Sequence, residues 1–507
     1  MIETISLSNF KGFRKLDALS IKPITILCGT NSCGKSSILQ SILLLKQTLE
    51  SQSPSQTILL NGRYAHLGTF ENLIYGKDPA NSIEFGLKLR LSRDTLRRPF
   101  GRRDLPLKFM LRNLLGRRDT TSGDAEYQLT LNTRFRQEAR KSSRAPAPIR
   151  VDQYRFELSE VTLAGLTSKV SCIATRQEDA LYRIELLNFP QRLMHGDQSL
   201  LTTTVTAKLE FTNLVPSEIR LKNASDTDDA AKQVTTAFYW VFQSLHQILR
   251  GVFSSYTYIG PLREEPSRRY IYEDEIVELG IKGENAAYIY LAEQEESADG
   301  NHFYDPATDG FTERPRERLG KAVRDWLDQM GIREFQPERV GELIYLSLDA
   351  STPNTRVSIA DVGFGVSQIF PIILEGLRMP KESTLLLEQP EIHLHPNLQM
   401  RLADYFIALA LSGKRVIVET HSDHIVNRLV RRIVEDRNGR MAQLIGIHFI
   451  TPSDAGSMCQ EVKVDPDRGI VNWPNDFFDQ AATEQERIIR ACLRKSMANR
   501  QSSAGVP

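Results

Sequence analysis

The stretch ITILCGTNSCGKSSIL, residues 24–39, decides the fold of this chain. Its first six residues are an apolar run with the length of a buried strand, and the residues after the second glycine begin a longer run with helical spacing. Between them GTNSCGKS, residues 29–36, matches the pattern G-x-x-x-x-G-K-[ST]. A glycine-rich turn from a strand into a helix can point its backbone N–H groups at phosphate oxygens. The sequence therefore predicts a phosphate-binding loop.

Each position of this loop has an expected role toward a nucleotide. Lys35 would reach the β- and γ-phosphates, and Ser36 would be a ligand of Mg²⁺. The N-terminus of the following helix adds partial positive charge, which favours the same anion. The predicted nucleotide-binding residues are Gly29, Thr30, Asn31, Ser32, Cys33, Gly34, Lys35, Ser36 and Ser37.

A second motif, TLLLEQPEIHLHP at residues 384–396, begins as a short buried strand and ends on a carboxylate. Glu388 lies at the carboxyl end of that strand, where ligands gather in open α/β sheets, and we expect it to hold Mg²⁺ directly or through water. Gln389 follows at the position of a catalytic base. An amide cannot take a proton from water but can orient it, so Gln389 predicts slow turnover. Glu391 could replace the base only if the turn brings it near the γ-phosphate.

Two further motifs flank this strand in the sequence. DVGFGVSQ, residues 361–368, ends a strand and opens a helix, which makes another anion-binding N-terminus. VIVETHSDH, residues 416–424, is the next buried strand, and His421 just past its end can hydrogen-bond a γ-phosphate.

The order of these four motifs resembles the ABC-type ATPase head of the RecF, SMC and OLD (overcoming lysogenization defect) ATPases, over roughly residues 1–75 and 340–452. The opening NFKGF turn, residues 9–13, belongs to the same resemblance. It implies ATP as the nucleotide, with Mg²⁺, and a head-to-tail homodimer or higher oligomer. In that dimer Gly365, Ser367 and Gln368 of one subunit would face the γ-phosphate bound by the other.

Three more stretches are similar to a narrower prokaryotic group of AAA-family ATPases that ends in a small C-terminal domain of unknown function. They are YIGPLREEPSRRY (258–270), GENAAYIYL (283–291) and GIVNWPNDFFDQ (469–480). We therefore expect an α/β fold, a P-loop ABC-type ATPase head split by a strand-rich and helical insertion. The predicted domains are 1–75 with 340–452 for the head, 76–339 for the insertion, and 453–507 for the C-terminal domain and tail.

The predicted insertion is required because more than 350 residues separate Lys35 from Glu388. From about residue 56 to 260, short runs of alternating apolar and polar residues predict antiparallel strands. Residues 232–252 have helical spacing, residues 341–363 predict a hairpin, and the tail from about 483 is expected to end without regular structure. The segment that follows residue 252, to about residue 340, is expected to be mixed and loop-rich but mostly helical.

The charge, the cysteine content and the apolar runs argue against several classes of protein. A net charge of +1 argues against a uniformly basic nucleic-acid binder, and five scattered cysteines without a CxxC pair indicate a reduced, cytoplasmic chain. The N-terminus has no apolar segment of a signal peptide, and no apolar run approaches the roughly 20 residues that span a bilayer, so we expect no membrane association.

Some residues allow rival interpretations. His393, His395, His421 and His424 have spacings that a metal site could use, but the nucleotide role is favoured because the first pair follows the carboxylate strand. Arg and Lys are concentrated in residues 90–118, which could bind DNA or RNA or could be a solvated loop. Arg263 and Arg268 are taken as structural. No paired carboxylates of a nuclease are found after His421.

Two hypotheses of function follow. In the first, an ATPase closes a dimer on ATP and opens it on hydrolysis, which acts on DNA or on a separately encoded effector in DNA repair or anti-phage defence. In the alternative, the protein is a non-hydrolysing, ATP-gated scaffold that holds or releases the effector.

Overall fold

The structure is a computed structural model, and it describes residues 1–52, 57–91, 126–138, 147–162, 165–178, 180–190, 200–222, 229–272, 278–349, 355–474, 477–478 and 480–503. The basic segment at 90–118 lies outside these residues except for its first two positions.

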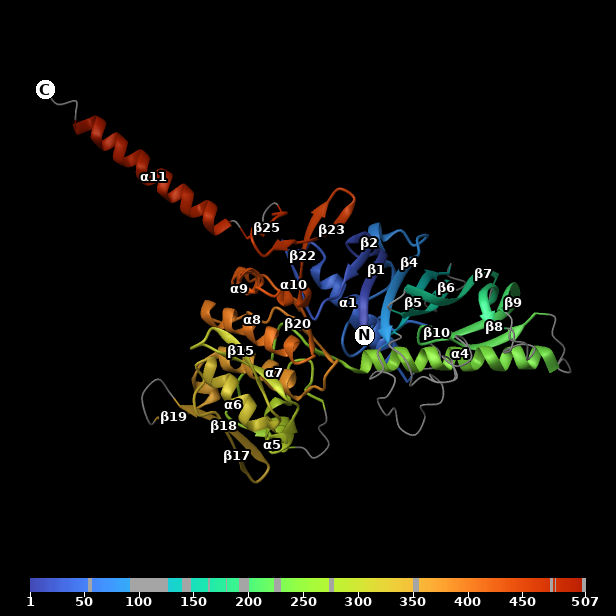
Figure 1. Ribbon diagram of the computed structural model, residues 1–507, viewed down its shortest axis with the longest axis horizontal. Helices are drawn as coiled ribbons and strands as arrows, with labels where there is room; N and C mark the ends of the chain where they lie inside the picture. Colours follow the sequence, from blue (N-terminus) through green and yellow to red (C-terminus); the bar gives the residue numbers. More distant parts are fainter. Residues whose placement is uncertain are drawn as a thin grey trace.

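A mainly parallel sheet forms the centre of the molecule (Figure 1). Its order is β11-β20-β21-β3-β22-β23, and every neighbouring pair is parallel except β22 with β23. The two strands that precede the predicted catalytic motifs, β20 and β21, are therefore direct neighbours, and β21 lies beside the strand that leads into the glycine-rich loop. The bounds are β3 (Ile24–Gly29), β11 (Tyr256–Ile259), β20 (Thr384–Glu388), β21 (Arg415–Glu419), β22 (Ile445–Ser453) and β23 (Gly456–Glu461).

Both faces of this sheet are buried, which explains why its strands are continuous apolar runs. Alternate side chains of a strand point to opposite faces. Leu386 and Ile417 belong to a core shared with helices α1 (Lys35–Glu50) and α4 (Asp229–Ser254). Leu385 and Val416 belong to a second core with α7 (Phe364–Arg378), α8 (Pro396–Leu411) and α9 (Asp423–Glu435).

A nine-stranded sheet, β10-β9-β8-β7-β6-β5-β4-β1-β2, packs on the other side of α1 and α4. All its pairs are antiparallel, as the alternating runs predict. It includes strands from both sides of the predicted domain boundary at residue 75, because β1 pairs with both β2 and β4. The bounds are β1 (Ile2–Phe10), β2 (Phe13–Ser20), β4 (Ile83–Leu91), β5 (Glu126–Gln137), β6 (Ile149–Thr162), β7 (Gly165–Glu178), β8 (Leu181–Pro190), β9 (Leu200–Thr212) and β10 (Val215–Leu221).

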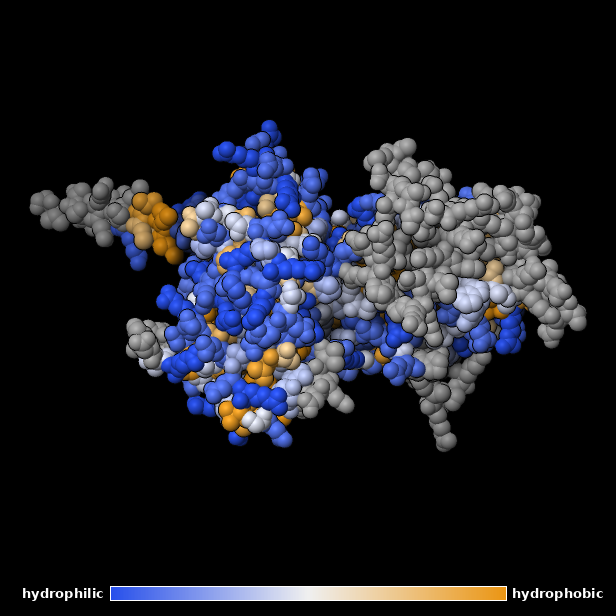
Figure 2. Space-filling view, turned by 60° about the horizontal axis from the view of Figure 1, so that its bottom comes forward, coloured by the Kyte–Doolittle hydropathy of each residue, from blue (hydrophilic) through white to orange (hydrophobic). Residues whose placement is uncertain are grey.

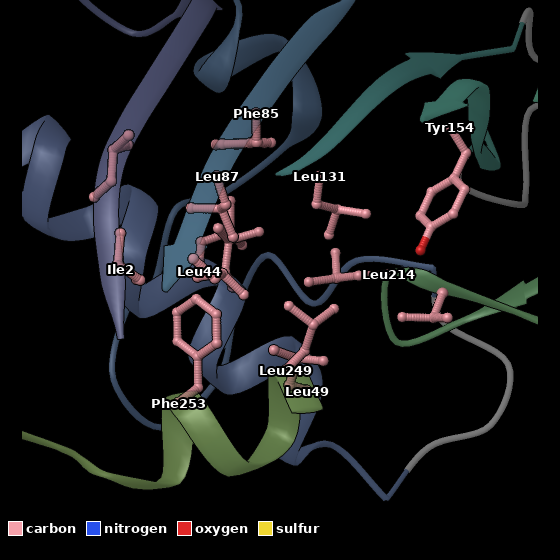
Figure 3. Close-up of a cluster of buried hydrophobic side chains, with 14 of the residues drawn as sticks. Ile2, Leu44, Leu49, Phe85, Leu87, Leu131, Tyr154, Leu214, Leu249 and Phe253 are labelled. Carbon is pink, nitrogen blue, oxygen red and sulfur yellow. The ribbon is translucent and has the colours of Figure 1, made fainter. Parts of the chain in front are cut away.

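Large apolar side chains fill the space between this sheet and the two helices (Figure 3). Leu44 on α1 and Phe253 on α4 meet Leu87 and Leu131 from the sheet, and all four are at most 5% exposed. This core holds the first helix after the glycine-rich loop against the N-terminal hairpin. The loop is thereby anchored at its helical end.

The region from about residue 264 to 340 contains more short strands than the sequence predicts. Two helices, α5 (Ala286–Glu293) and α6 (Leu319–Gln329), pack against α7 in the second core. The expected hairpin is confirmed, since β18 pairs antiparallel with β19. The strands are β12 (Tyr270–Ile271), β13 (Ser297–Ala298), β14 (Asn301–Asp305), β15 (Gly310–Arg314), β16 (Glu317–Arg318), β17 (Gln336–Val340), β18 (Leu343–Asp349) and β19 (Arg356–Ser358).

A buried ion cluster ties this region to the helices behind the parallel sheet. Asp404 on α8 is fully buried and accepts hydrogen bonds from Arg428 at 2.7 Å and from Arg432 at 3.0 Å, both on α9. Arg432 also donates to Asp309 at 2.8 Å, in the turn between β14 and β15. The cluster therefore joins three segments that are distant in sequence.

The chain ends in helix α11 (Gln480–Ser503), which projects away from the body (Figure 1). The charged part of the tail after residue 483 forms this helix as far as Ser503, because ion pairs at helical spacing, Glu484 with Arg487 and Glu486 with Arg490, favour a helix. The last four residues of the expected irregular end lie outside the described residues. Its exposed Ile488 and Ile489 contribute an apolar patch that Figure 2 shows in orange. Among the described residues, no helix has the length and apolar content needed to cross a membrane.

Short elements complete the described chain. They are the 3₁₀ turns η1 (Phe70–Leu73), η2 (Tyr75–Lys77) and η4 (Ile359–Asp361), helix α10 (Arg440–Leu444), and the paired strands β24 (Val464–Asp465) and β25 (Gly469–Ile470).

Candidate functional site

The glycine-rich loop runs from the end of β3 to the start of α1, as predicted, and its two glycines are required by the backbone. Gly29 has φ +145°, and a Cβ there would lie 2.0 Å from the carbonyl oxygen of Ile450 on β22. Gly34 has φ +100° at the helix N-cap, and a Cβ there would lie 2.9 Å from Ser457 Oγ. Any larger residue would push the loop away from the neighbouring strands.

The buried ammonium group of Lys35 lies inside the loop. Its Nζ donates to the carbonyl oxygens of Gly29 at 3.1 Å and Thr30 at 2.6 Å. The buried hydroxyl of Thr30 has no hydrogen-bond partner within the described chain. Cys33 is buried against Lys35, with its sulfur 3.8 Å from Nζ. An ammonium group held by neutral atoms of the loop is the arrangement that a phosphate group would complete.

The hydroxyl of Ser36, in the first turn of α1, donates to Glu419 Oε1 at 2.8 Å. Glu419 is the last residue of β21 and is 3% exposed, and its other oxygen, Oε2, is buried and has no hydrogen-bond partner among the described residues. Glu388 ends the adjacent strand β20 and is the register partner of Glu419. Two carboxylates therefore end neighbouring strands beside the predicted magnesium ligand of the loop.

Hydrogen bonds from Tyr258 and Arg263 and one to Glu419 hold Glu388 and Gln389 in place. Tyr258, on the edge strand β11, donates its hydroxyl to Glu388 Oε1 at 3.1 Å. Arg263 donates to the carbonyl oxygens of Glu388 at 2.9 Å and Gln389 at 3.2 Å. Gln389 has φ +44°, which is uncommon for a residue with a side chain and is typical of positions that their surroundings hold in place. The backbone N–H of Gln389 donates to the carbonyl oxygen of Glu419 at 2.8 Å.

Both oxygens of Glu391 are occupied. Thr420 Oγ1 donates to one at 2.8 Å, and the amide of His421 donates to the other at 2.7 Å. Glu391 thus holds the segment after β21 against the turn after β20. His421 itself is exposed.

Residues 363–368 are the N-cap and the first residues of α7. Ser367 Oγ donates to Phe364 O at 2.8 Å, and Ser367 and Gln368 are buried in their own chain. Gly365 lies against the backbone of His393. Phe364 is 47% exposed, so at this end of α7 it is the first residue of the helix, and not Ser367 or Gln368, whose side chain reaches the surface.

The negative charge of the carboxyl groups at this edge of the sheet is compensated only in part. Burial, and next the charge of Glu419, raises the pKa of Glu388 to about 7, against smaller lowering by Tyr258, Arg263 and Lys11. Burial also raises the pKa values of Glu419 and Glu391. Mg²⁺ binds through one or two carboxylates together with phosphates and water. An orphaned carboxylate oxygen beside the Ser36 hydroxyl fits that ion.

The four histidines of the rival interpretation lie in different local settings. His395 caps α8 by accepting from the amide of Asn397, the ring of His393 lies against Phe364, and His424 lies 3.6 Å from Asp423. Among the described residues, no group of three or more His, Cys, Asp or Glu side chains is placed to hold a metal ion.

Glu419 and Arg263 are residues that sequence reasoning missed or set aside. Glu419 ends an apolar strand on a carboxylate, the same signal that singled out Glu388. Arg263 was taken as structural, and it contacts the backbone of both Glu388 and Gln389. Arg268, also taken as structural, pairs with Asp361 at 2.7 Å.

The glycine-rich loop between β3 and α1 and the mainly parallel sheet define an α/β fold with a P-loop, which is typical of ATPases. The sequence matches the family described as AAA ATPase domain over residues 1–135 and 297–426, just over half of the chain, and the chain belongs to that family. Residues 442–488 match a family described as protein of unknown function (DUF3696). No curated protein matches the sequence.

The solved structures to which the chain is similar include three SMC heads. An SMC head bound to the C-winged helix domain of ScpA is 11% identical, with TM-score 0.39, over 92% of this chain and 98% of that one. The SMC head domain from Thermotoga maritima is 11% identical, with TM-score 0.32, over 91% and 99%. An SMC head domain with an extended coiled coil, bound to the C-terminal domain of ScpA and derived from Pyrococcus furiosus, is 10% identical, with TM-score 0.36, over 96% and 99%. The family assignment rests on the sequence matches.

Proposed function

We propose that the protein is an ABC-type ATPase that binds ATP and Mg²⁺ between two copies of its head and hydrolyses ATP slowly. The observation that carries this proposal is the pairing of Ser36 in the glycine-rich loop with Glu419, beside Glu388 and Gln389. It unites the loop with the strand ends at which the sequence predicts the hydrolytic groups.

The chain's own residues would act as follows. Lys35 exchanges its loop carbonyls for the β- and γ-phosphate oxygens, and the loop amides hold the remaining phosphate oxygens. Ser36 and Glu388 hold the metal ion, which when bound supplies positive charge to the phosphate oxygens. Gln389 orients the attacking water, and His421, exposed after β21, hydrogen-bonds the γ-phosphate. Glu391 supports His421 by accepting from its amide.

Slow turnover follows from the amide at position 389. Since an amide takes no proton, water activation depends on orientation alone. Both oxygens of Glu391 already accept hydrogen bonds, which disfavours it as the substitute base. We therefore infer a long-lived ATP-bound state.

Dimerisation is supported by the surface of the α7 helix start. Val362 and Phe364 are 37% and 47% exposed there, so this helix start offers apolar side chains that a second copy could cover. In the proposed dimer this helix start, with Gly365, Ser367 and Gln368, covers the γ-phosphate bound by the other copy.

The biological role that we propose is ATP-controlled action on DNA or on a separately encoded effector, in DNA repair or anti-phage defence. The resemblance to RecF, SMC and OLD ATPases and the basic composition of residues 90–118 support it. The second candidate, an ATP-gated scaffold without turnover, is favoured by Gln389 and differs from the first only in the hydrolysis rate.

The test combines three measurements on the full-length protein. A fluorescent ATP analogue measures binding, light scattering after size exclusion measures dimerisation, and steady-state phosphate release measures turnover with and without DNA. We expect ATP-dependent dimers and slow release of phosphate. Release at background with normal dimerisation would favour the scaffold, and a Lys35→Ala variant that binds and hydrolyses ATP normally would overturn both functions.

A further inference from the structure

Glu419 is a buried carboxylate whose surroundings leave it incomplete. Its side chain is 3% exposed, and one oxygen accepts from Ser36 Oγ at 2.8 Å. The other oxygen, Oε2, has no hydrogen-bond partner among the described residues. A buried unsatisfied carboxylate oxygen costs free energy, and in a native protein such an atom commonly marks a bound ion or water.

The backbone fixes Glu419 between the two halves of the site. Glu419 is the register partner of Leu27 on β3 and of Glu388 on β20. The backbone N–H of Gln389 donates to the carbonyl oxygen of Glu419. The main chain of Glu419 is therefore held against the end of β20. Residues in register on adjacent strands point to the same face, so two negative side chains lie next to each other.

Lys35, the cation of the loop, compensates the charge of Glu419 only in part, because burial still raises the pKa of that carboxyl. The ammonium group of Lys35 donates to the carbonyl oxygens of Gly29 and Thr30. Like charges placed side by side repel, and a divalent cation with oxygen ligands is the partner that removes both the repulsion and the unsatisfied oxygen. The Ser36 hydroxyl, already in contact with Glu419, adds a neutral oxygen ligand.

We propose that Glu419 is a second carboxylate of the metal site, which together with Ser36 and Glu388 binds a divalent cation before the nucleotide arrives. This assignment rests on the proposed function, since it specifies the metal of the same site. Glu419 is the positioning partner of Ser36 and supplies its free oxygen to the ion or to a water on it. In this proposal the metal ion is already bound to the protein when the nucleotide arrives. In P-loop sites that use one carboxylate and the substrate phosphates, the metal ion arrives together with the nucleotide.

Binding of Mn²⁺ to the full-length, nucleotide-free protein tests this assignment. Mn²⁺ suits carboxylate, hydroxyl and water ligands, and the loss of its free-ion paramagnetic resonance signal counts bound ions directly. We expect one Mn²⁺ per chain in the wild type. Glu419→Gln should weaken binding by about 10- to 100-fold, the usual effect of losing a group that supports a metal ligand. Glu419→Asp should retain part of the affinity, and Glu338→Gln, at an exposed position on β17, should retain all of it.

Binding of a fluorescent ATP analogue in EDTA separates the possible failures. Far-UV circular dichroism and urea unfolding of Glu419→Gln show whether the variant folds. Unchanged Mn²⁺ affinity in Glu419→Gln, or a wild type that takes up Mn²⁺ only with nucleotide, would overturn the metal assignment. Failure of the wild type to bind the analogue with or without Mg²⁺ would instead overturn the proposed function.

Discussion

Replacing Glu388 by glutamine should stabilise the nucleotide-free protein at pH 8 and have little effect at pH 5. The pKa of this carboxyl rises from 4.5 to about 7 in the folded protein, mainly because it is buried and next because Glu419 lies beside it. Each pKa unit corresponds to about 1.4 kcal/mol, so ionised Glu388 costs the folded state about 3 kcal/mol relative to the unfolded chain. Glutamine carries no charge, and its carbonyl oxygen can still accept from Tyr258.

The sign follows from proton binding. Because the folded-state pKa is raised, the folded protein holds more protons between about pH 4.5 and 7, and stability from this group is lost as pH rises through that window. The full cost is felt at pH 8, where Glu388→Gln removes it. Urea unfolding of metal-free protein, compared between wild type and variant at each pH, measures the difference. Glu338→Gln, at an exposed position, is the matched control and should show no pH-dependent gain.

Two results would refute this reasoning. A variant that is no more stable than wild type at pH 8 would mean that Glu388 is not destabilised when ionised. An equal gain at pH 5 and pH 8 would mean that packing or hydrogen bonding, and not charge, is responsible.

Three other substitutions have expected outcomes. Asp404→Ala removes the buried carboxylate that Arg428 and Arg432 share, and should lower the free energy of unfolding by about 3–5 kcal/mol in urea; a loss below about 1 kcal/mol would show that their remaining partners, such as Asp309, suffice. Phe253→Ala opens a cavity in the core of Figure 3 and should also cost about 3–5 kcal/mol, measured by the same unfolding assay. Gln389→Glu should raise steady-state phosphate release or leave it unchanged, and a large loss of rate would show that the amide itself positions the water.

Local sequence determined the elements that contain the expected site. Residues 24–50 read as strand, glycine turn and helix, and the structure has β3, the loop and α1 there. The same holds for the strands that end on Glu388 and Glu419, and for α7 after its glycine-rich start. These signals are local because periodicity and glycine content act on the backbone directly.

Composition alone did not predict the helix at the C-terminal tail. The charged residues after 483 indicated a chain that leads into an irregular end, and as far as Ser503 they form α11. Charges of opposite sign three and four residues apart support a helix there even without a buried face.

The sequence by itself therefore determined the class of protein: a phosphate-binding loop between a strand and a helix, and carboxylate-ended strands far along the chain. The tertiary structure alone decided which groups meet. Ser36 and Glu419 are 383 positions apart, and they meet because β21, not β20, lies beside β3. Strand order is set by non-local packing of two buried faces, which no short stretch of sequence encodes, whereas the turn of the loop depends only on the residues within it.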